Sequence, residues 1–290
     1  MKGIILAGGL GTRLHPSTIS VSKQLLPIYD KPLIYYPLAN LMSAGINQIL
    51  IISTSDNIIL FKKLFGNGSK LGLELSYEPQ DKPNGIAEAF LIGEKFINGN
   101  DVTLILGDNI FYGNQIKKRM KDLNTEKCIG AKIFAYKVPD PERYGVVEFD
   151  SNFSALSIEE KPKAPKSNYA VTGLYVYDSN VSELAKTLAP SLRGELEITD
   201  LNNLYLHNDK LEVILLDSGT AWLDAGTPDS LLEAAHFIQT IQKRQLIQVA
   251  CIEEIALKQN FISKKQFEKI ASAAPKNRYG EYLRDLSKDI

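Results

Sequence analysis

The sequence predicts an α/β protein with a doubly wound, mostly parallel, Rossmann-like sheet, an inserted strand-rich part and C-terminal helices. In the first half, short apolar runs alternate with segments of helical periodicity, which is typical of βαβ units. Beyond about residue 130, strand patterns follow one another more closely, with proline-containing turns between several of them. The final stretch is helical in pattern, and the chain contains no internal repeat or flexible linker.

Four apolar runs of the first half have the length of buried strands. They cover 4–7, 48–52, 73–77 and 102–106. Helical periodicity covers 35–44, 57–65 and 86–96. Gly45 should end the first of these helices, and Asp56 should cap the second. Because right-handed crossovers bring the ends of parallel strands to one edge of the sheet, a ligand should bind at that edge.

The second half is richer in strands. Strand patterns cover 131–138, 146–149, 155–159, 170–177, 211–216 and 221–224, and helical patterns cover 180–188 and 200–207. A further helix should begin at Thr227, because threonine is a good N-cap and Pro228 suits the first helical position. Its expected apolar stripe consists of Leu231, Leu232, Ala235 and Ile238.

The composition is that of an ordinary globular protein and excludes several function classes. Hydrophobic residues make up 44% and charged residues 23%, which argues against disorder. The 33 basic and 34 acidic residues give a net charge of -1, without the basic excess of proteins that bind duplex nucleic acid. No apolar stretch approaches a membrane span, and the N-terminal apolar run is too short for a signal peptide. We therefore expect neither nucleic acid nor membrane as a partner, and a cytoplasmic location.

The two cysteines, Cys128 and Cys251, lie far apart and have no companion at metal-ligand or redox spacing. We therefore expect both cysteines to be reduced, partly buried thiols.

A glycine-rich loop follows the first strand directly. Three glycines within four positions let the backbone turn sharply and bring its N–H groups against phosphate oxygens. A hydroxyl donor and a guanidinium follow them, and a lysine ten residues further on could reach the same phosphates. These residues are Gly8, Gly9, Gly11, Thr12, Arg13 and Lys23. Taken alone, the glycines are equally typical of an ordinary turn beside a solvated arginine.

Two other phosphate-binding motifs fail in this loop. A Walker A loop requires Gly-Lys-Ser/Thr at its end, whereas Gly11 is followed by Thr12 and Arg13. The dinucleotide fingerprint requires a third glycine where Leu14 stands. Asp30 has about the right spacing for a ribose partner, but the segment 23–32 contains two prolines and fits a strand poorly. A nicotinamide enzyme is therefore disfavoured.

Two further positions suit nucleotide chemistry without requiring it. Asp108 follows a buried strand, where a carboxylate is well placed to hold magnesium, although an Asx turn would look the same. Gln80 carries both a donor and an acceptor, as needed to recognise the edge of a pyrimidine base, although a surface glutamine is more common.

The whole chain resembles the bacterial glucose-1-phosphate thymidylyltransferases of the sugar-nucleotidyltransferase superfamily. The superfamily pattern G-G-x-G-T-R is present from Gly8 to Arg13, and it is followed by Lys23. The segment Ser-Lys-Gln-Leu-Leu-Pro at 22–27 is similar to the thymidylyltransferase branch, and the resemblance extends to Tyr-Gly-Glu-Tyr-Leu at 279–283.

This resemblance implies roles for three groups of residues. The nucleotide should be bound by Gly8, Gly9, Gly11, Thr12, Arg13, Lys23, Gln24, Gln80, Gly85 and Asp108. The sugar phosphate should be bound by Asn109, Tyr144, Gly145, Glu160, Lys161, Val171 and Glu195. Asp108 and Asp224 should hold Mg²⁺, which requires both predicted strands to end on the same edge of the sheet. The catalytic residues should be Arg13, Lys23, Lys161 and Asp108.

The resemblance also implies a domain organisation. Residues 1–240 should form a single nucleotidyltransferase domain, with a nucleotide-binding part over about 1–128 and a sugar-binding part over about 129–226. Residues 241–290 should form a helical extension for subunit contacts in a homotetramer and for regulation. Where many relatives have a proline before two glutamates, this chain has Ile252, which weakens the regulatory expectation.

The implied reaction is transfer of a thymidylyl group from dTTP to glucose 1-phosphate, assisted by Mg²⁺, as the first step toward dTDP-deoxysugars such as dTDP-rhamnose. The same chemistry with UTP or another hexose 1-phosphate is the nearest alternative. A non-catalytic nucleotide-sugar sensor is a more distant one.

Overall fold

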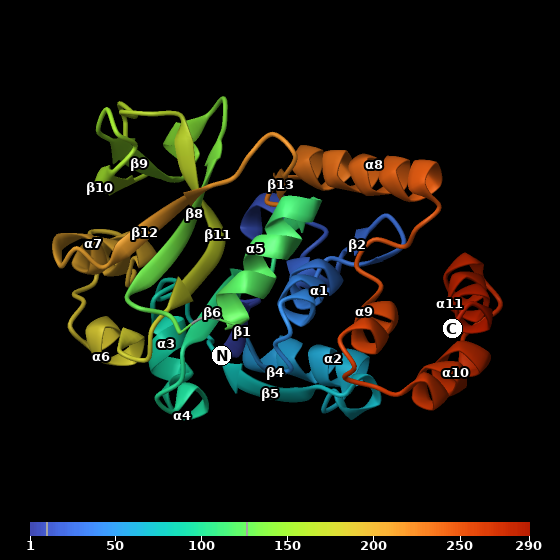
Figure 1. Cartoon of the computed structure of the whole chain (residues 1–290). Coiled ribbons are helices and arrows are strands. Elements are labelled where there is room, and N and C mark those ends of the chain that lie inside the picture. Colours follow the sequence, from blue (N-terminus) through green and yellow to red (C-terminus); the bar gives the residue numbers. More distant parts are fainter. Residues whose placement is uncertain (10, 126) are drawn as a thin grey trace.

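In the computed structural model, which describes residues 1–9, 11–125 and 127–290, a nine-stranded sheet forms the centre of the protein (Figure 1). Its parallel block contains, in spatial order, β5 (Glu74–Pro79), β4 (Gln48–Ser53), β1 (Lys2–Leu6) and β6 (Val102–Leu106). The chain runs outward from β1 to β5 and then returns to the other side of β1 for β6. The strand order therefore reverses between β1 and β6, as in doubly wound folds.

Helices cover both faces of this block. Successive side chains of a strand point to opposite faces, so each strand contributes to two apolar cores. Ile5 packs in one apolar core and Ile4 with Leu6 in another. The first core includes residues of α1 (Tyr35–Ser43), α2 (Ser55–Phe65), α5 (Asn114–Thr125), α9 (Ile252–Lys258), α10 (Lys264–Ala273) and α11 (Arg278–Lys288). The second includes residues of α3 (Glu88–Ile92), α4 (Glu94–Ile97), α6 (Val181–Lys186) and α7 (Ile198–His207). The predicted fold class is confirmed.

The strand-rich part continues the same sheet. The long strand β11 (Tyr169–Tyr177) pairs antiparallel with β8 on one side and with β6 and, at Ala170, β9 on the other. The remaining strands of this part are β8 (Ala131–Lys137), β9 (Gly145–Phe149), β10 (Ala155–Glu160) and β12 (Leu211–Leu215). In Figure 1 they gather on the side of the molecule opposite α10 and α11. Tyr177, at the end of β11, is completely buried, so the two parts share one core rather than meeting at a linker.

Two short ribbons lie beside the main sheet. One consists of β7 (Asn109–Tyr112) and β13 (Ala221–Asp224), and the other of β2 (Pro27–Ile28) and β3 (Lys31–Pro32). The helix α8 (Pro228–Gln245) follows β13 and leads to the C-terminal helices (Figure 1). Its start agrees with the prediction, because the Thr227 hydroxyl oxygen accepts a hydrogen bond from the Ser230 N–H at 3.2 Å.

One predicted helix is divided in two. The pattern over 86–96 suggested one helix, but the structure has α3 and α4 with Gly93 between them. A Cβ atom at Gly93 would lie 2.9 Å from the Ala89 carbonyl oxygen and 3.1 Å from Ile4. The break therefore coincides with a close approach to β1, and glycine is also a weak helix former.

The predicted cap of α2 is wrong. The helix begins at Ser55 after the N-cap Thr54, and Asp56 lies within the first turn. The N–H of Ser55 instead donates to the Asp81 carboxylate at 2.7 Å. Because this acceptor comes from a segment distant in sequence, the local pattern could not reveal it.

One member of the predicted stripe on α8 is also misplaced. Leu232 is 57% exposed, whereas Ala234 and Ile238 are buried. The helix turns Ala234 inward against the core that contains Ile28 and Ile110, so the buried face is rotated from the predicted one.

Both cysteines are buried free thiols, as expected. Burial raises the pKa of Cys128 to about 12 and that of Cys251 to about 12. Since the thiolate is the reactive form, the folded protein should react with a disulfide reagent at pH 8 about a thousandfold more slowly than a free thiol. Measuring thiol release with and without denaturant checks this. Rapid reaction of the folded protein would contradict the burial.

Among the described ranges, no helix combines the length and apolar character required to cross a bilayer.

Candidate active site

The candidate site lies at the point where the strand order reverses. Leu6 and Leu106 are opposite each other in the pairing of β1 with β6, and the Gly107 N–H donates to the Leu6 carbonyl at 2.9 Å. The glycine loop that follows β1 and the Asp108 that follows β6 therefore emerge side by side. Ligands of open α/β sheets bind in the crevice at such a reversal.

A first cavity of about 210 Å³ opens beside the glycine loop. It is lined by Leu6, Gly8, Gly9, Gln24, Gln80, Pro83, Gly85, Ile86, Leu106, Asp108 and Glu195. The buried Gln80 uses its amide nitrogen to donate to the Gly85 carbonyl at 3.1 Å and to Glu88 at 2.8 Å. Both N–H groups of this amide are thereby engaged, so its carbonyl oxygen remains as an acceptor on the Gly8 side.

The far wall of the first cavity depends on a segment from the second half of the chain. Gly85 has φ +107°, and a Cβ atom there would lie 2.3 Å from the Leu196 carbonyl oxygen. The same carbonyl accepts from the Ala87 N–H at 3.2 Å, and the Leu196 N–H donates to Asn84 at 2.6 Å. Only glycine fits this contact, because both the positive φ and the close backbone approach exclude a side chain.

A second cavity of about 500 Å³ shares Asp108, Ile86 and Leu106 with the first. Its other lining residues are Arg13, Asn109, Arg143, Tyr144, Gly145, Glu160, Lys161, Val171, Gly173, Tyr175, Ile198, Trp222 and Asp224. The two cavities therefore meet at a buried carboxylate.

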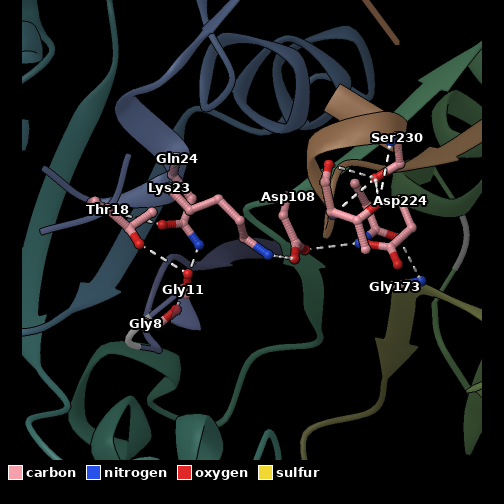
Figure 2. A network of polar contacts seen from close by, with 12 residues as sticks. Gly8, Gly11, Thr18, Lys23, Gln24, Asp108, Gly173, Asp224 and Ser230 are labelled. Atoms are coloured by element: carbon pink, nitrogen blue, oxygen red, sulfur yellow. Dashed lines mark hydrogen bonds and ion pairs between the residues drawn. The ribbon is translucent and has the colours of Figure 1, made fainter. Parts of the chain in front are cut away.

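Asp108 is held from two sides. The Lys23 ammonium forms an ion pair with one carboxylate oxygen (Figure 2). The Asn109 amide donates to the other oxygen at 2.9 Å. Burial alone would raise the pKa of Asp108, but the charge of Lys23 and these hydrogen bonds outweigh it and lower the pKa below its usual value. Asp108 is therefore ionised near neutral pH.

Asn109 is itself fixed by its neighbours. Its side-chain oxygen accepts from the Trp222 indole N–H at 2.6 Å and from the Gly173 N–H at 3.1 Å. Its amide nitrogen donates to Asp108 with one N–H, and the second N–H remains available. Asn109 can therefore orient Asp108 and can also lie beside the sugar, as the resemblance implies.

Asp224 reaches the site by a route that the sequence did not predict. Its strand, β13, does not belong to the main sheet but pairs with β7, placing Asp224 opposite Asn109. Since β7 begins directly after Asp108, this pairing brings the second carboxylate to the first. The expected convergence of the two aspartates is present, but the expected common sheet edge is not its cause.

The two carboxylates suit a bound divalent cation. Burial raises the pKa of Asp224, and the negative charge of Asp108 raises it further, against the opposing effect of Lys23, Arg13 and Arg143. Two carboxylates that repel each other in one cavity are relieved by a cation between them. Elsewhere among the described residues, no cluster of three or more His, Cys, Asp or Glu side chains could hold a metal. Two carboxylates are sufficient for Mg²⁺, which usually completes its shell with water and substrate phosphates.

Arg13 is exposed and faces the same cavity from the glycine loop. Its Nη2 atom lies 3.1 Å from the position of a Cβ atom at Gly226, just after Asp224. The absence of a side chain at Gly226 therefore leaves room for the guanidinium. Arg13, Asp108 and Asp224 thus face one cavity.

The sugar-side residues lie around the other end of this cavity. Lys161 has φ +46°, and its ammonium lies 3.6 Å from Glu160. The other oxygen of Glu160 accepts from the Thr199 hydroxyl at 2.7 Å. Tyr144, Gly145 and Val171 complete this wall, as the resemblance implied.

Five predicted site residues have a different position. Arg13, expected with the nucleotide, lines only the second cavity. Gly11, Thr12 and Lys23 do not line either cavity; Gly11 and Thr12 lie in the turn that carries Arg13, and Lys23 contacts the site through Asp108. Glu195, expected at the sugar end, lines the first cavity instead, because Leu196 draws its segment against the turn at Gly85.

Sequence reasoning missed three polar residues of the site. Arg143 lies 3.7 Å from Asp224, Trp222 donates to Asn109, and Thr199 donates to Glu160. Arg143 directly precedes Tyr144, and Trp222 shares β13 with Asp224, so adjacency to predicted residues was the available signal. Thr199 lies four residues after the predicted Glu195, so its segment was indicated but its role was not.

Comparisons with known proteins find relatives over almost the whole chain. The family model described as "Nucleotidyl transferase" matches residues 2–241. A glucose-1-phosphate thymidylyltransferase from Neisseria meningitidis serogroup A is 55% identical over 288 residues, covering 99% of this chain and all of that protein. One from Mycobacterium tuberculosis is 51% identical over 286 residues, covering 99% of each chain.

Two solved structures are similar in fold. A Bacillus anthracis protein assigned to the glucose-1-phosphate thymidylyltransferases, crystallised with sucrose, has a TM-score of 0.75 at 43% identity, covering 82% of this chain and 94% of that one. A UDP-glucose pyrophosphorylase complexed with UDP-glucose has a TM-score of 0.72 at 25% identity, covering 82% and 98%.

Proposed function

The chain belongs to the nucleotidyl transferase family and is an enzyme of that class, and we propose that it transfers a thymidylyl group from dTTP to glucose 1-phosphate, releasing pyrophosphate. The observation that carries this proposal is the pair of cavities that meet at Asp108. One suits a nucleotide and the other a sugar phosphate, so the reacting phosphates would meet beside the two aspartates.

The first cavity suits a pyrimidine base. With both amide N–H groups of Gln80 engaged, its carbonyl oxygen can accept the N3–H of thymine or uracil. Cytosine has no N–H at that position and would be disfavoured. The glycine loop beside it, with Gly8 and Gly9 in the cavity wall, suits the triphosphate.

The reaction is a direct displacement at the α-phosphorus of dTTP. A phosphate oxygen of glucose 1-phosphate is already anionic, so no general base is required. The difficulty is the approach of two polyanions and the charge that develops on the leaving pyrophosphate. Arg13, Lys23 and Lys161 supply positive charge where these groups meet. Magnesium held by Asp108 and Asp224 would neutralise phosphate charge when bound.

A pyrophosphate-release assay with dTTP, glucose 1-phosphate and Mg²⁺ tests this function, with EDTA as the metal-free control. We expect turnover that EDTA abolishes and that no single substrate supports. Rates with UTP and with other hexose 1-phosphates test the nearest alternative, since Gln80 does not separate thymine from uracil. A non-catalytic sensor is disfavoured because Arg13, Asp108 and Asp224 are all retained and face one cavity.

We also propose that residues 241–290 contribute a regulatory site and subunit contacts of a homotetramer, beside the catalytic unit formed by residues 1–240. A third cavity, of about 540 Å³, lies between α1, α5 and the C-terminal helices. It is lined by Asn40, Gln248, Lys117, Lys118 and Lys121 among others. The three lysines favour an anionic ligand, and the amide nitrogen of Asn40 and the carbonyl oxygen of Gln248, both buried without a partner, add one donor and one acceptor that a nucleotide could use.

If this cavity mediates feedback, Lys121→Met should weaken inhibition by dTDP-rhamnose about tenfold while the uninhibited rate stays unchanged. Lys269→Met, on the exposed face of α10, is the matched control and should leave inhibition unaltered. Inhibition that competes with dTTP and is equal in all three proteins would remove the regulatory role. A scattering mass of one 32.2 kDa chain would contradict the tetramer.

A further inference from the structure

Arg193 lies behind the sugar-side wall and faces three carboxylates. Its guanidinium donates to Glu197 from Nε at 3.1 Å and from Nη2 at 2.8 Å. The same Nη2 atom lies 3.2 Å from Glu195 and 3.6 Å from Glu160. Arg193 lines neither substrate cavity, so its charge acts on substrates only through these neighbours.

One carboxylate oxygen of Glu160 accepts a hydrogen bond within the protein, and the other can accept one from a ligand. Oε2 accepts from the Thr199 hydroxyl at 2.7 Å, which orients the carboxylate. Oε1 lies 3.6 Å from both Arg193 Nη2 and Lys161 Nζ. At that distance the two cations attract Oε1 without using it as a direct hydrogen-bond acceptor, so Oε1 can accept from a sugar hydroxyl.

Without Arg193, this arrangement would be self-repelling. Glu160, Glu195 and Glu197 all lie around a single guanidinium, and Glu197 is buried. The charges of Glu197 and Glu160 also act on Asp200. Its pKa is raised, first by burial and then by these two charges. Loss of the cation would drive these carboxylates apart, and Glu160, whose side chain is 26% exposed, can move into the second cavity.

The segment that carries Arg193 also closes the first cavity. Glu195 lines that cavity, and Leu196 is tied by backbone hydrogen bonds to Asn84 and Ala87. Ser191 stabilises the turn by donating to Glu197 at 2.7 Å. The segment that carries Arg193 is therefore held in place by residues beside the first cavity, where the nucleotide is proposed to bind.

We propose that Arg193 is a positioning residue that holds Glu160 in the orientation in which it recognises a hydroxyl of the sugar phosphate. This inference rests on the proposed function, and it extends that function to a residue outside both cavities.

The test compares steady-state kinetics of Arg193→Met, Arg193→Lys, Glu160→Gln and the double variant Arg193→Met/Glu160→Gln with the parent enzyme. We expect Arg193→Met to raise KM for glucose 1-phosphate about tenfold, with kcat and KM for dTTP changed by less than about twofold. Arg193→Lys should recover part of the loss, because lysine restores the charge but not the two-pronged contact with Glu197. In the Glu160→Gln background, Arg193→Met should add less than about twofold.

Lys186→Met serves as the matched control. Lys186 is similarly exposed and pairs with two glutamates, Glu94 and Glu183, away from both cavities. It should leave both KM values unchanged.

Two results would overturn the inference. One is an unchanged KM for the sugar phosphate in Arg193→Met. The other is a double variant whose change in KM for glucose 1-phosphate equals the product of the two single-variant changes. That result would show that Arg193 does not act through Glu160. Failure of the proposed function is recognised separately, because the parent enzyme would then not turn over dTTP and glucose 1-phosphate at all.

Discussion

Replacement of Asp108 by asparagine is expected to lower kcat/KM by about a thousandfold or more, equivalent to about 4 kcal/mol of transition-state stabilisation. The carboxylate borders both cavities, forms the ion pair with Lys23 and is one of two groups suited to Mg²⁺. Asparagine keeps the shape but removes the charge, so both the lysine and the metal lose their anionic partner. Pyrophosphate release under saturating Mg²⁺ measures the effect.

Asp229→Asn is the matched control for this variant, because Asp229 is exposed in the first turn of α8. It should retain the parent rate. Asp224→Asn should behave like Asp108→Asn and should also require more Mg²⁺ for half-maximal activity. Retention of a tenth of the activity by Asp108→Asn would exclude its proposed place at the reacting phosphates.

Substitution of Arg13 by alanine should cost about 3–4 kcal/mol, or a few hundredfold in kcat/KM, with folding unaffected. Its side chain is exposed and lies over Gly226, where the phosphates would approach Asp224. An arginine there stabilises negative charge that develops during displacement, so the loss should appear mainly in kcat. Steady-state kinetics together with a thermal melt separate this effect from instability.

Arg244→Ala, an exposed arginine near the end of α8, is the control for loss of a surface cation. Its kinetics should match those of the parent. If Arg13→Ala turns over within a few fold of the parent, the guanidinium has no part in catalysis.

Much of the architecture could be predicted because local pattern and tertiary packing agree. Strand β1 is apolar on both faces, and Ile4 and Ile5 do pack in opposite cores. The glycine loop and Asp108 follow adjacent parallel strands, so the rule that ligands bind at the reversal of strand order was sufficient to bring them together.

The misplaced features depend on contacts between distant segments. The start of α2 is satisfied by Asp81, the break at Gly93 lies where the helix approaches Ile4, and Asp224 arrives by pairing with β7. None of these has a periodic signature, because each requires a partner far along the chain. Thr199, which was missed, acts on the Glu160 side chain and lines neither cavity, so its role could not be read from its own position in the sequence.

The Leu196 carbonyl packs against Gly85, and this contact bears on whether the first part of the chain could act as a separate unit. The rim of the first cavity, where we propose that the base binds, is completed by a residue 111 positions further along the chain, and β6 is flanked by β11 from the same later half. The first 128 residues are therefore not an autonomous nucleotide-binding module. A chimera that exchanges sugar specificity between relatives must graft the segment around Leu196 as part of the nucleotide half, or it will change both substrates at once.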